Sequence, residues 1–302
     1  MEFAARSEEE AVRLLHEHGV CWIEGVLAPD AVETCRTAAL DRFAEVLRTL
    51  VLLQAMRTHS DSPPPAIRYG EVVERDGGRY DVRHKMCDEP FATLFARDGA
   101  ASRLVPLLLR ALGGEADVIA LGQVVAMSLE GWAQAGELAD SEDVVVSLGD
   151  QEWHTDGPVS LFAEATTSSH LPPYALNVFF PLVDLNGSNG PTEFAAGPGS
   201  AIIFDYRLWH RGRANNSDQD RPMLYAVVAR PWFHDYKNHR YEHSLFGGQV
   251  APCPRMALGE ERAGLPVSHS DQLADLKRSI EPRERSQKPS RVSRSKRSAS
   301  RT

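Results

Sequence analysis

The sequence of 302 residues has no apolar run long enough to cross a membrane. A membrane-spanning helix needs about 20 consecutive apolar residues, and the longest candidate, Leu47 to Met56, contains Arg48, Thr49 and Gln54. The first ten residues hold four glutamates and no basic segment, which argues against a secretory signal. We therefore expect neither a membrane span nor export.

Cysteine is scarce and shows no pairing pattern. The four cysteines lie far apart without a CxxC spacing, which favours buried thiols in a reducing compartment over a disulfide framework or a zinc finger. They are Cys21, Cys35, Cys87 and Cys253. This pattern predicts a cytoplasmic protein.

Positive charge is scarce until the last twenty residues. Residues 283–302 contain eight Lys or Arg and one Glu, which leaves 25 basic and 41 acidic residues in 1–282, from totals of 33 and 42. Because phosphate binding needs clustered positive charge, the acidic body is a poor nucleic-acid platform. The basic, Ser-rich tail has almost no apolar residues, so we expect it to be disordered. Contact of this tail with RNA, anionic lipid or an import receptor stays open, beside an inert solubilising role.

Helical patterns come first along the chain and strand patterns follow. A capping box at Ser7 and Glu10, and a stop at Gly19, bound the first expected helix. Short apolar runs between turn residues indicate a sandwich or barrel rather than alternating βαβ units. The expected helices are 7–19, 29–56 and 90–112, and the expected strands are 20–27, 118–129, 144–148, 174–183, 201–206 and 223–229. We expect one domain over residues 1–255 and a C-terminal extension over 256–302, basic from about 283.

The segment around His154 carries the first chemical signal. Residues two apart in an extended segment share a face, so His154 and Asp156 can present an imidazole and a carboxylate together. His210, after the strand 201–206, supplies a second imidazole. Two histidines and one carboxylate that leave coordination positions open are the ligand set of non-haem Fe(II) oxygenases.

Arg221 follows His210 by eleven residues, with the turn-forming run Ala214 to Asp218 between them. A hairpin closed at this turn would make His210 and Arg221 neighbours on antiparallel strands, about 5 Å apart. A guanidinium can bind a carboxylate bidentately, so a metal-bound oxo-acid with a far carboxylate, such as 2-oxoglutarate, fits this arrangement. A purely structural ion pair of Arg221 is the alternative, with partners from Asp205, Asp218 and Asp220.

Together these motifs resemble the phytanoyl-CoA dioxygenase family of Fe(II)/2-oxoglutarate-dependent oxygenases, over roughly residues 8–240. The resemblance rests on segments 153–157 (WHTDG), 177–185 (NVFFPLVDL), 189–194 (NGPTEF), 204–205 (FD), 208–212 (LWHRG) and 221–225 (RPMLY). It implies a mainly β fold, a double-stranded β-helix (jelly roll, cupin-like) core buttressed by N-terminal helices. It implies Fe(II) held by His154, Asp156 and His210, with Arg221 at the distal carboxylate of 2-oxoglutarate and with Asn177 and Gln123 in contact with this co-substrate.

The implied activity is oxidation of a small organic substrate with O2 and 2-oxoglutarate, supported by ascorbate, with release of succinate and CO2. Family halogenases lack the carboxylate ligand, so Asp156 favours hydroxylation or a related oxidation. The sequence departs from the family pattern in two segments that concern access to the site. The segment 194–200 is shorter than in the family, and the segment 131–149 is longer and could form a lid. A catalytically idle jelly-roll interaction module with the basic tail as binding element, and a metal enzyme that does not use 2-oxoglutarate, remain alternatives.

Several other residues near these motifs have simpler explanations. Trp153 and Trp209 are expected to pack beside the ligands rather than contact substrate. Arg79, Arg83 and Lys85 are expected to form surface ion pairs on a strand edge, with an acidic substrate as the alternative partner.

Overall fold

The structure is a computed structural model. It describes residues 3–55, 67–75, 78–85, 87–128, 130–131, 149–158, 172–190, 198–235, 238, 243–247 and 255–259. The chain divides into two compact units, residues 1–266 and 267–302, and all described residues belong to the first. The basic tail from residue 283 thus lies outside the described residues. Among the residues that are described, no helix has the length and apolarity needed to span a membrane.

The N-terminal elements follow the sequence signals closely. Helix α1 (Glu8–His18) begins where the Ser7 hydroxyl accepts the Glu10 N–H at 3.2 Å, and it ends at Gly19 with a φ of 74°. Strand β1 (Val20–Ile23) is shorter than predicted. Helix α2 (Pro29–Ala55) ends within a residue of its predicted limit.

The single helix predicted over residues 90–112 is wrong in its first half. Two short 3₁₀ turns, η1 (Phe91–Thr93) and η2 (Ser102–Leu104), precede helix α3 (Val105–Leu112). Gly99 packs so closely that a Cβ there would lie 2.0 Å from the Thr93 carbonyl oxygen. The chain folds back on itself at this glycine, and a continuous helix cannot form.

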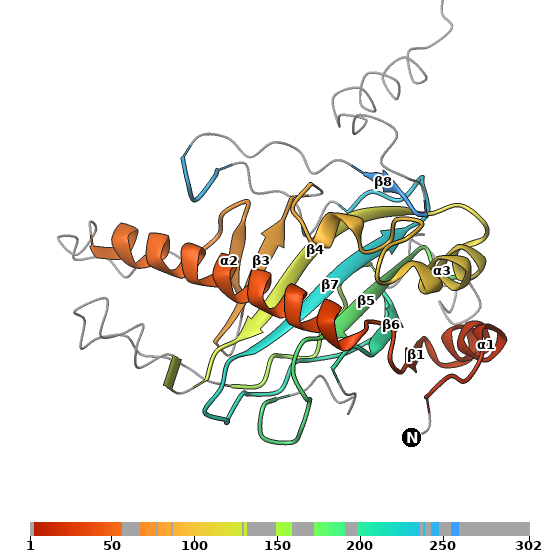
Figure 1. The fold of residues 1–302 in the computed structure, drawn as a ribbon, viewed down its shortest axis with the longest axis horizontal. Helices are drawn as coiled ribbons and strands as arrows, with labels where there is room; N and C mark the ends of the chain where they lie inside the picture. The colour runs from red at the N-terminus through yellow and green to blue at the C-terminus, as the bar shows by residue number, and fades with distance from the viewer. Residues whose placement is uncertain are drawn as a thin grey trace, which may run out of the picture. The chain divides into compact units, whose positions relative to one another are not determined.

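A single antiparallel sheet forms the framework of the unit (Figure 1). Its strands lie in the order β1-β6-β5-β7-β4-β3-β2, and β8 pairs with the start of β4. The bounds are β2 (Val72–Arg75), β3 (Arg79–His84), β4 (Asp117–Ala126), β5 (Ala175–Pro181), β6 (Ala201–Asp205), β7 (Arg221–Ala229) and β8 (Met256–Ala257). β8 carries the domain past the predicted boundary at 255. Strands β2 and β8 were not predicted, and the predicted strand 144–148 lies outside the described residues.

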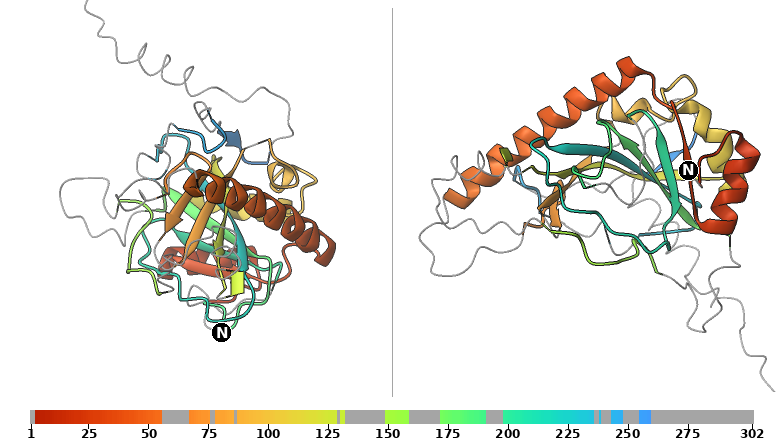
Figure 2. Two further views of the ribbon diagram at one scale, coloured as in Figure 1. Left: turned by 90° about the vertical axis from the view of Figure 1, so that its left-hand side faces the viewer. Right: turned by 90° about the horizontal axis from the view of Figure 1, so that it is seen from below.

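The two faces of this sheet have different neighbours. Helix α2 runs across one face, as Figures 1 and 2 show, and its Phe43 and Val46 pack with Val82 and Val125. Because side chains alternate along a strand, residues next to Val82 and Val125 point to the opposite face. We call this opposite face the interior face.

A second, shorter ladder lies over the interior face. His154 and His210 exchange both main-chain hydrogen bonds, at 3.0 and 2.9 Å, and the Gly157 N–H donates to the Tyr206 carbonyl at 3.0 Å. Two antiparallel layers that face each other in this way form a double-stranded β-helix. The predicted fold class, a jelly-roll core with helices packed on one face, is confirmed.

Candidate metal centre

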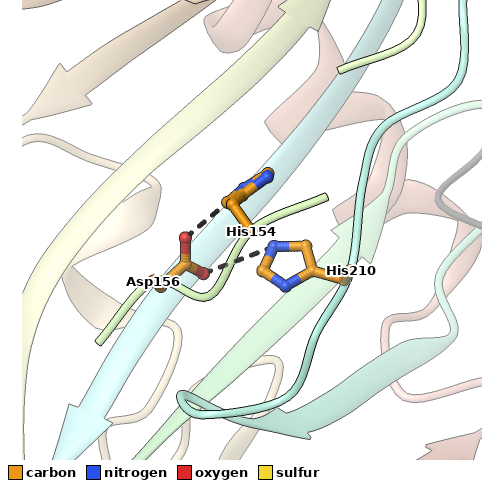
Figure 3. A group of neighbouring side chains, drawn as sticks. All are labelled: His154, Asp156 and His210. Carbon is orange, nitrogen blue, oxygen red and sulfur yellow. Dashed lines mark ion pairs between the residues drawn. The ribbon is translucent and has the colours of Figure 1, made fainter. Parts of the chain in front are cut away.

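The ladder over the interior face brings the three predicted metal ligands together (Figure 3). His154 Nε2 lies 3.8 Å from Asp156 Oδ1, and His210 Nε2 lies 3.5 Å from Asp156 Oδ2. One ligand atom from each residue falls within 4.8 Å of the others. Ligands at about 2.0–2.2 Å from a shared ion lie at most about 4.4 Å apart, and the separations of 3.8 and 3.5 Å from Asp156 fall within this limit.

Both imidazoles are oriented for metal binding through Nε2. His154 Nδ1 lies 2.8 Å from the Glu152 carbonyl, and His210 Nδ1 lies 3.0 Å from the Leu208 carbonyl. A carbonyl only accepts, so each Nδ1 carries a proton, and in the neutral imidazole Nε2 is then the nitrogen with the lone pair. The donor set therefore fits a divalent metal ion before any ion is bound.

Two asparagines hold Asp156, one by its carboxylate and one by its main chain. Asn177, on β5 and buried, donates from Nδ2 to Asp156 Oδ2 at 2.6 Å. Asn238 donates to the main-chain oxygen of Asp156 at 3.1 Å. The amide nitrogen of Asn177 is thus used to orient a candidate ligand, and its expected contact with a co-substrate stays a prediction.

Arg221, at the start of β7, is buried and has no carboxylate partner among the described residues. Its hydrogen-bond contact is Nη1 to the Met223 sulfur at 4.0 Å, and its Nε has no partner. Burial, with a further contribution from Arg79, lowers the pKa of Arg221 to about 9. A buried guanidinium with no counter-ion is costly, so this position favours an anionic ligand.

The structural alternative for Arg221, an ion pair with a nearby aspartate, is not formed. Asp205 pairs with Arg207 at 2.5 Å, and Asp220 accepts the Ser128 N–H at 2.7 Å. Neither these residues nor Asp218 contacts the Arg221 guanidinium among the described residues.

The predicted direct pairing of His210 with Arg221 is wrong. Arg221 pairs with Ala126 of β4, whereas His210 pairs with His154. The expected turn does form, because Asn215 Oδ1 accepts the Ser217 N–H at 3.1 Å. It connects the short ladder to the large sheet instead of closing a hairpin within one sheet.

Arg79 is the neighbour of Arg221 on the interior face. Ala126 pairs with Arg79 on one side and with Arg221 on the other, so a small side chain separates two buried arginines. The Arg79 guanidinium donates to the carbonyls of Gly149 and Arg213. Arg213 is three residues from His210, about 10 Å along extended chain, so the arginine pair and the metal cluster share one interior.

Gln123 does not lie in that interior, and its predicted contact with a co-substrate is wrong. It pairs with Val82 and Leu224, whose side chains pack on the helix-covered face. Its Nε2 donates to the Ala39 carbonyl of α2 at 2.8 Å. The side chain therefore points away from the metal cluster, into the layer between sheet and helix.

The sequence interpretation also missed a charged group on β2 and β3. Asp81 is buried and accepts hydrogen bonds from Arg75 Nη2 and from the Tyr225 hydroxyl, both at 2.7 Å. Arg83 lies 3.9 Å from the same carboxylate. The surface ion pairs predicted for Arg79 and Arg83 are therefore wrong, since both side chains face the interior.

Trp153 and Trp209 flank the histidines without being buried. They are 48% and 60% exposed, and Arg211 lies 5.0 Å from the Trp153 ring centroid. Trp153 thus packs against Arg211, next to His210, and the packing role of Trp209 stays a prediction. Most of the segment 131–149 and of the shortened loop 194–200 lies outside the described residues.

A scan against models of protein families found no match. Solved structures similar to the chain include HygX from Streptomyces hygroscopicus with nickel and 2-oxoglutarate bound, with 13% identity over 82% of this chain and 96% of that chain, and a TM-score of 0.46. AviO1 from Streptomyces viridochromogenes Tue57 is 16% identical over 76% of this chain and 98% of that chain, with a TM-score of 0.45. SnoK, a non-heme alpha-ketoglutarate-dependent carbocyclase from nogalamycin biosynthesis, is 14% identical over 84% of this chain and 97% of that chain, with a TM-score of 0.45. Similarities of this size assign no activity to the chain.

Proposed function

We propose that this protein is an Fe(II)- and 2-oxoglutarate-dependent dioxygenase that hydroxylates a small organic molecule, with release of succinate and CO2. The observation that carries the proposal is the pairing of two features in one interior. One is a His-Asp-His cluster in which a main-chain carbonyl holds each imidazole by Nδ1, and the other is a buried arginine without a carboxylate partner among the described residues.

His154, Asp156 and His210 would hold the metal ion. When bound, Fe(II) supplies the activation of O2 and the oxidative decarboxylation of the co-substrate, which no side chain can supply. The protein's own residues do the positioning. Asn177 fixes the Asp156 carboxylate, and the two main-chain carbonyls next to the imidazoles hold the histidines in one tautomer.

Arg221 would bind the distal carboxylate of 2-oxoglutarate, with Arg79 adding positive charge on the other side of Ala126. Guanidinium and carboxylate match as a bidentate pair. The same contact would relieve the cost of burying Arg221 without a partner. A metal enzyme that used no dicarboxylic co-substrate would have no evident use for this buried charge.

Release of succinate tests the proposal. The full chain with Fe(II), ascorbate and 2-oxoglutarate under air should release succinate even without its substrate, through slow uncoupled turnover. His210→Ala and Asp156→Ala should abolish the release, and His16→Ala, on the exposed side of α1, should not change it. Undiminished turnover in either ligand variant would refute the metal assignment.

A further inference from the structure

The interior face carries three arginines besides Arg221. The interior-facing side chains of β2, β3 and β7 include four arginines and one acid, namely Arg75, Arg79, Arg83, Arg221 and Asp81. Arg79 and Arg221 form the pair on either side of Ala126. Arg75 and Arg83 both lie near the Asp81 carboxylate, with Arg75 Nη2 at 2.7 Å and Arg83 Nη2 at 3.9 Å from Oδ2.

Arg75 is oriented through a hydrogen bond to the buried Asp81. Its Nη2 donates to Asp81 Oδ2, and the other oxygen of Asp81 accepts from the Tyr225 hydroxyl. Tyr225 reaches Asp81 by lying across Gly122, where a Cβ would be 2.5 Å from the Tyr225 ring and hydroxyl. The absence of a side chain at Gly122 thus allows the bond that orients the carboxylate and, through it, Arg75.

One side of the Arg75 guanidinium remains available. A guanidinium has five N–H groups. One of them, on Nη2, donates to Asp81, and the other four have no hydrogen-bond partner among the described residues. The side chain is 36% exposed. A guanidinium that is anchored on one side and open on the other can bind a carboxylate or a phosphate with its open side.

This group of charges lies next to the metal cluster. Arg83 donates from Nη2 to the main-chain oxygen of Asn238, and Asn238 donates to the main-chain oxygen of Asp156. Burial acts to lower the pKa of Arg75. The negative charges of Asp81, Tyr225 and Asp156 act in the opposite direction, and the pKa is raised overall. Contacts through Asp81, Arg83 and Asn238 thus connect Arg75 with the candidate metal ligand Asp156.

We propose that Arg75, oriented by Asp81 and Tyr225, binds an anionic group of the substrate, a carboxylate or a phosphate. This inference rests on the proposed function, because it assigns the substrate of the same metal centre. The substrate anion is distinct from the co-substrate anion, which occupies Arg221. The reaction at the metal would then take place on a carbon of an organic acid or phosphate ester whose charged end is held at Arg75.

Matched small molecules with and without charge test this proposal. The full chain is loaded anaerobically with Fe(II) and saturating 2-oxoglutarate, so that the Arg221 site is filled. Phenylacetate, phenyl phosphate and the neutral phenylacetamide are then titrated by calorimetry into wild type, Arg75→Gln and Arg75→Lys. Arg13→Gln is the control, since it removes one arginine from an exposed ion pair with Glu17.

In wild type and in Arg13→Gln, at least one of the two anions should bind about tenfold or more tightly than the amide. Arg75→Gln should lose about 10- to 100-fold in affinity for that anion, the range of a charged hydrogen-bonded contact, and should bind the amide unchanged. Arg75→Lys keeps the positive charge but lacks the planar guanidinium. Its affinity for the anion should therefore lie between those of wild type and Arg75→Gln. Whether phenylacetate or phenyl phosphate binds better identifies the kind of anion.

Equal binding of anions and amide, no binding of either anion to wild type, or full anion affinity in folded Arg75→Gln or Arg75→Lys would overturn the proposal. Failure of the proposed function is recognised separately. Fe(II) chelated by 2-oxoglutarate gives a visible charge-transfer band before any probe is added. Absence of that band in wild type contradicts the co-substrate assignment, whereas a normal band without anion selectivity contradicts only the role of Arg75.

Discussion

Replacing Asn177 by alanine should weaken metal binding although Asn177 is not a metal ligand. The Asn177 amide donates to Asp156 Oδ2 at 2.6 Å, and the side chain is only 2% exposed, so water cannot readily replace it. A hydrogen bond to a charged group contributes about 1.5–3 kcal/mol, and 1.4 kcal/mol corresponds to a factor of ten. We therefore expect the dissociation constant of the metal to rise about 10- to 100-fold, as is typical when a residue that orients a ligand is lost.

An anaerobic Fe(II) titration of the full chain measures this constant directly. Gln123→Ala is the matched control, because it removes a buried amide from the same sheet on the opposite face. Gln123→Ala should lower the free energy of unfolding and leave metal affinity unchanged. Equal metal affinity in wild type and Asn177→Ala would refute the idea that Asn177 orients Asp156, and a loss in Gln123→Ala would show that the assay reports folding.

Three further changes test other parts of the structure. Arg221→Gln should raise the KM for 2-oxoglutarate about 10- to 100-fold in succinate assays, through loss of a charged contact. An unchanged KM would contradict the binding of the distal carboxylate by Arg221. Burial lowers the pKa of His84 from 6.5 to about 3, so between these values the unfolded chain binds a proton that the folded chain does not, and stability falls as pH falls below 6.5. His84→Leu should therefore reduce the loss of unfolding free energy between pH 7 and pH 5 by about 2 kcal/mol, and urea unfolding that shows the same loss as wild type would contradict this. Gly122→Ala should destabilise by about 1–3 kcal/mol in urea unfolding, because its Cβ overlaps Tyr225, and a wild-type midpoint would count against the close packing.

Local signals predicted the elements that local physics determines. The capping residue Ser7 and the stop at Gly19 mark the ends of α1, and the spacing of His154 and Asp156 places both side chains toward one point. In each case the residues that interact are close in sequence, or belong to a motif whose geometry an extended strand fixes.

The assignment of Gln123 failed because β4 is buried on both faces. Nearly every residue of this strand is buried, so alternation of apolar and polar residues does not reveal which face meets α2 and which meets the metal cluster. The sequence predicts the strand but not its orientation.

The prediction that the arginines of β3 lie on the surface failed for a different reason. Charged side chains are mostly exposed, which led Arg79 and Arg83 to be placed on a strand edge. Their partners come from distant parts of the chain: Arg79 donates to the Arg213 carbonyl, and Arg83 to the Asn238 carbonyl. Such partners have no local sequence signal.

The expected hairpin between His210 and Arg221 shows the limit of turn signals. The turn at Asn215 was predicted correctly, but a turn does not specify whether the flanking segments pair with each other. Here each segment pairs with a strand from another part of the chain, His210 with His154 and Arg221 with Ala126.

The most direct test of the central claim is an anaerobic titration of the purified full chain with Fe(II) in the presence of 2-oxoglutarate, followed by visible absorption. If His154, Asp156 and His210 hold the iron beside the Arg221 anion site, a charge-transfer band should develop with one iron per chain. The band should need 2-oxoglutarate and should vanish in Asp156→Ala. No iron uptake by the wild-type protein, or uptake without this band, would contradict the account.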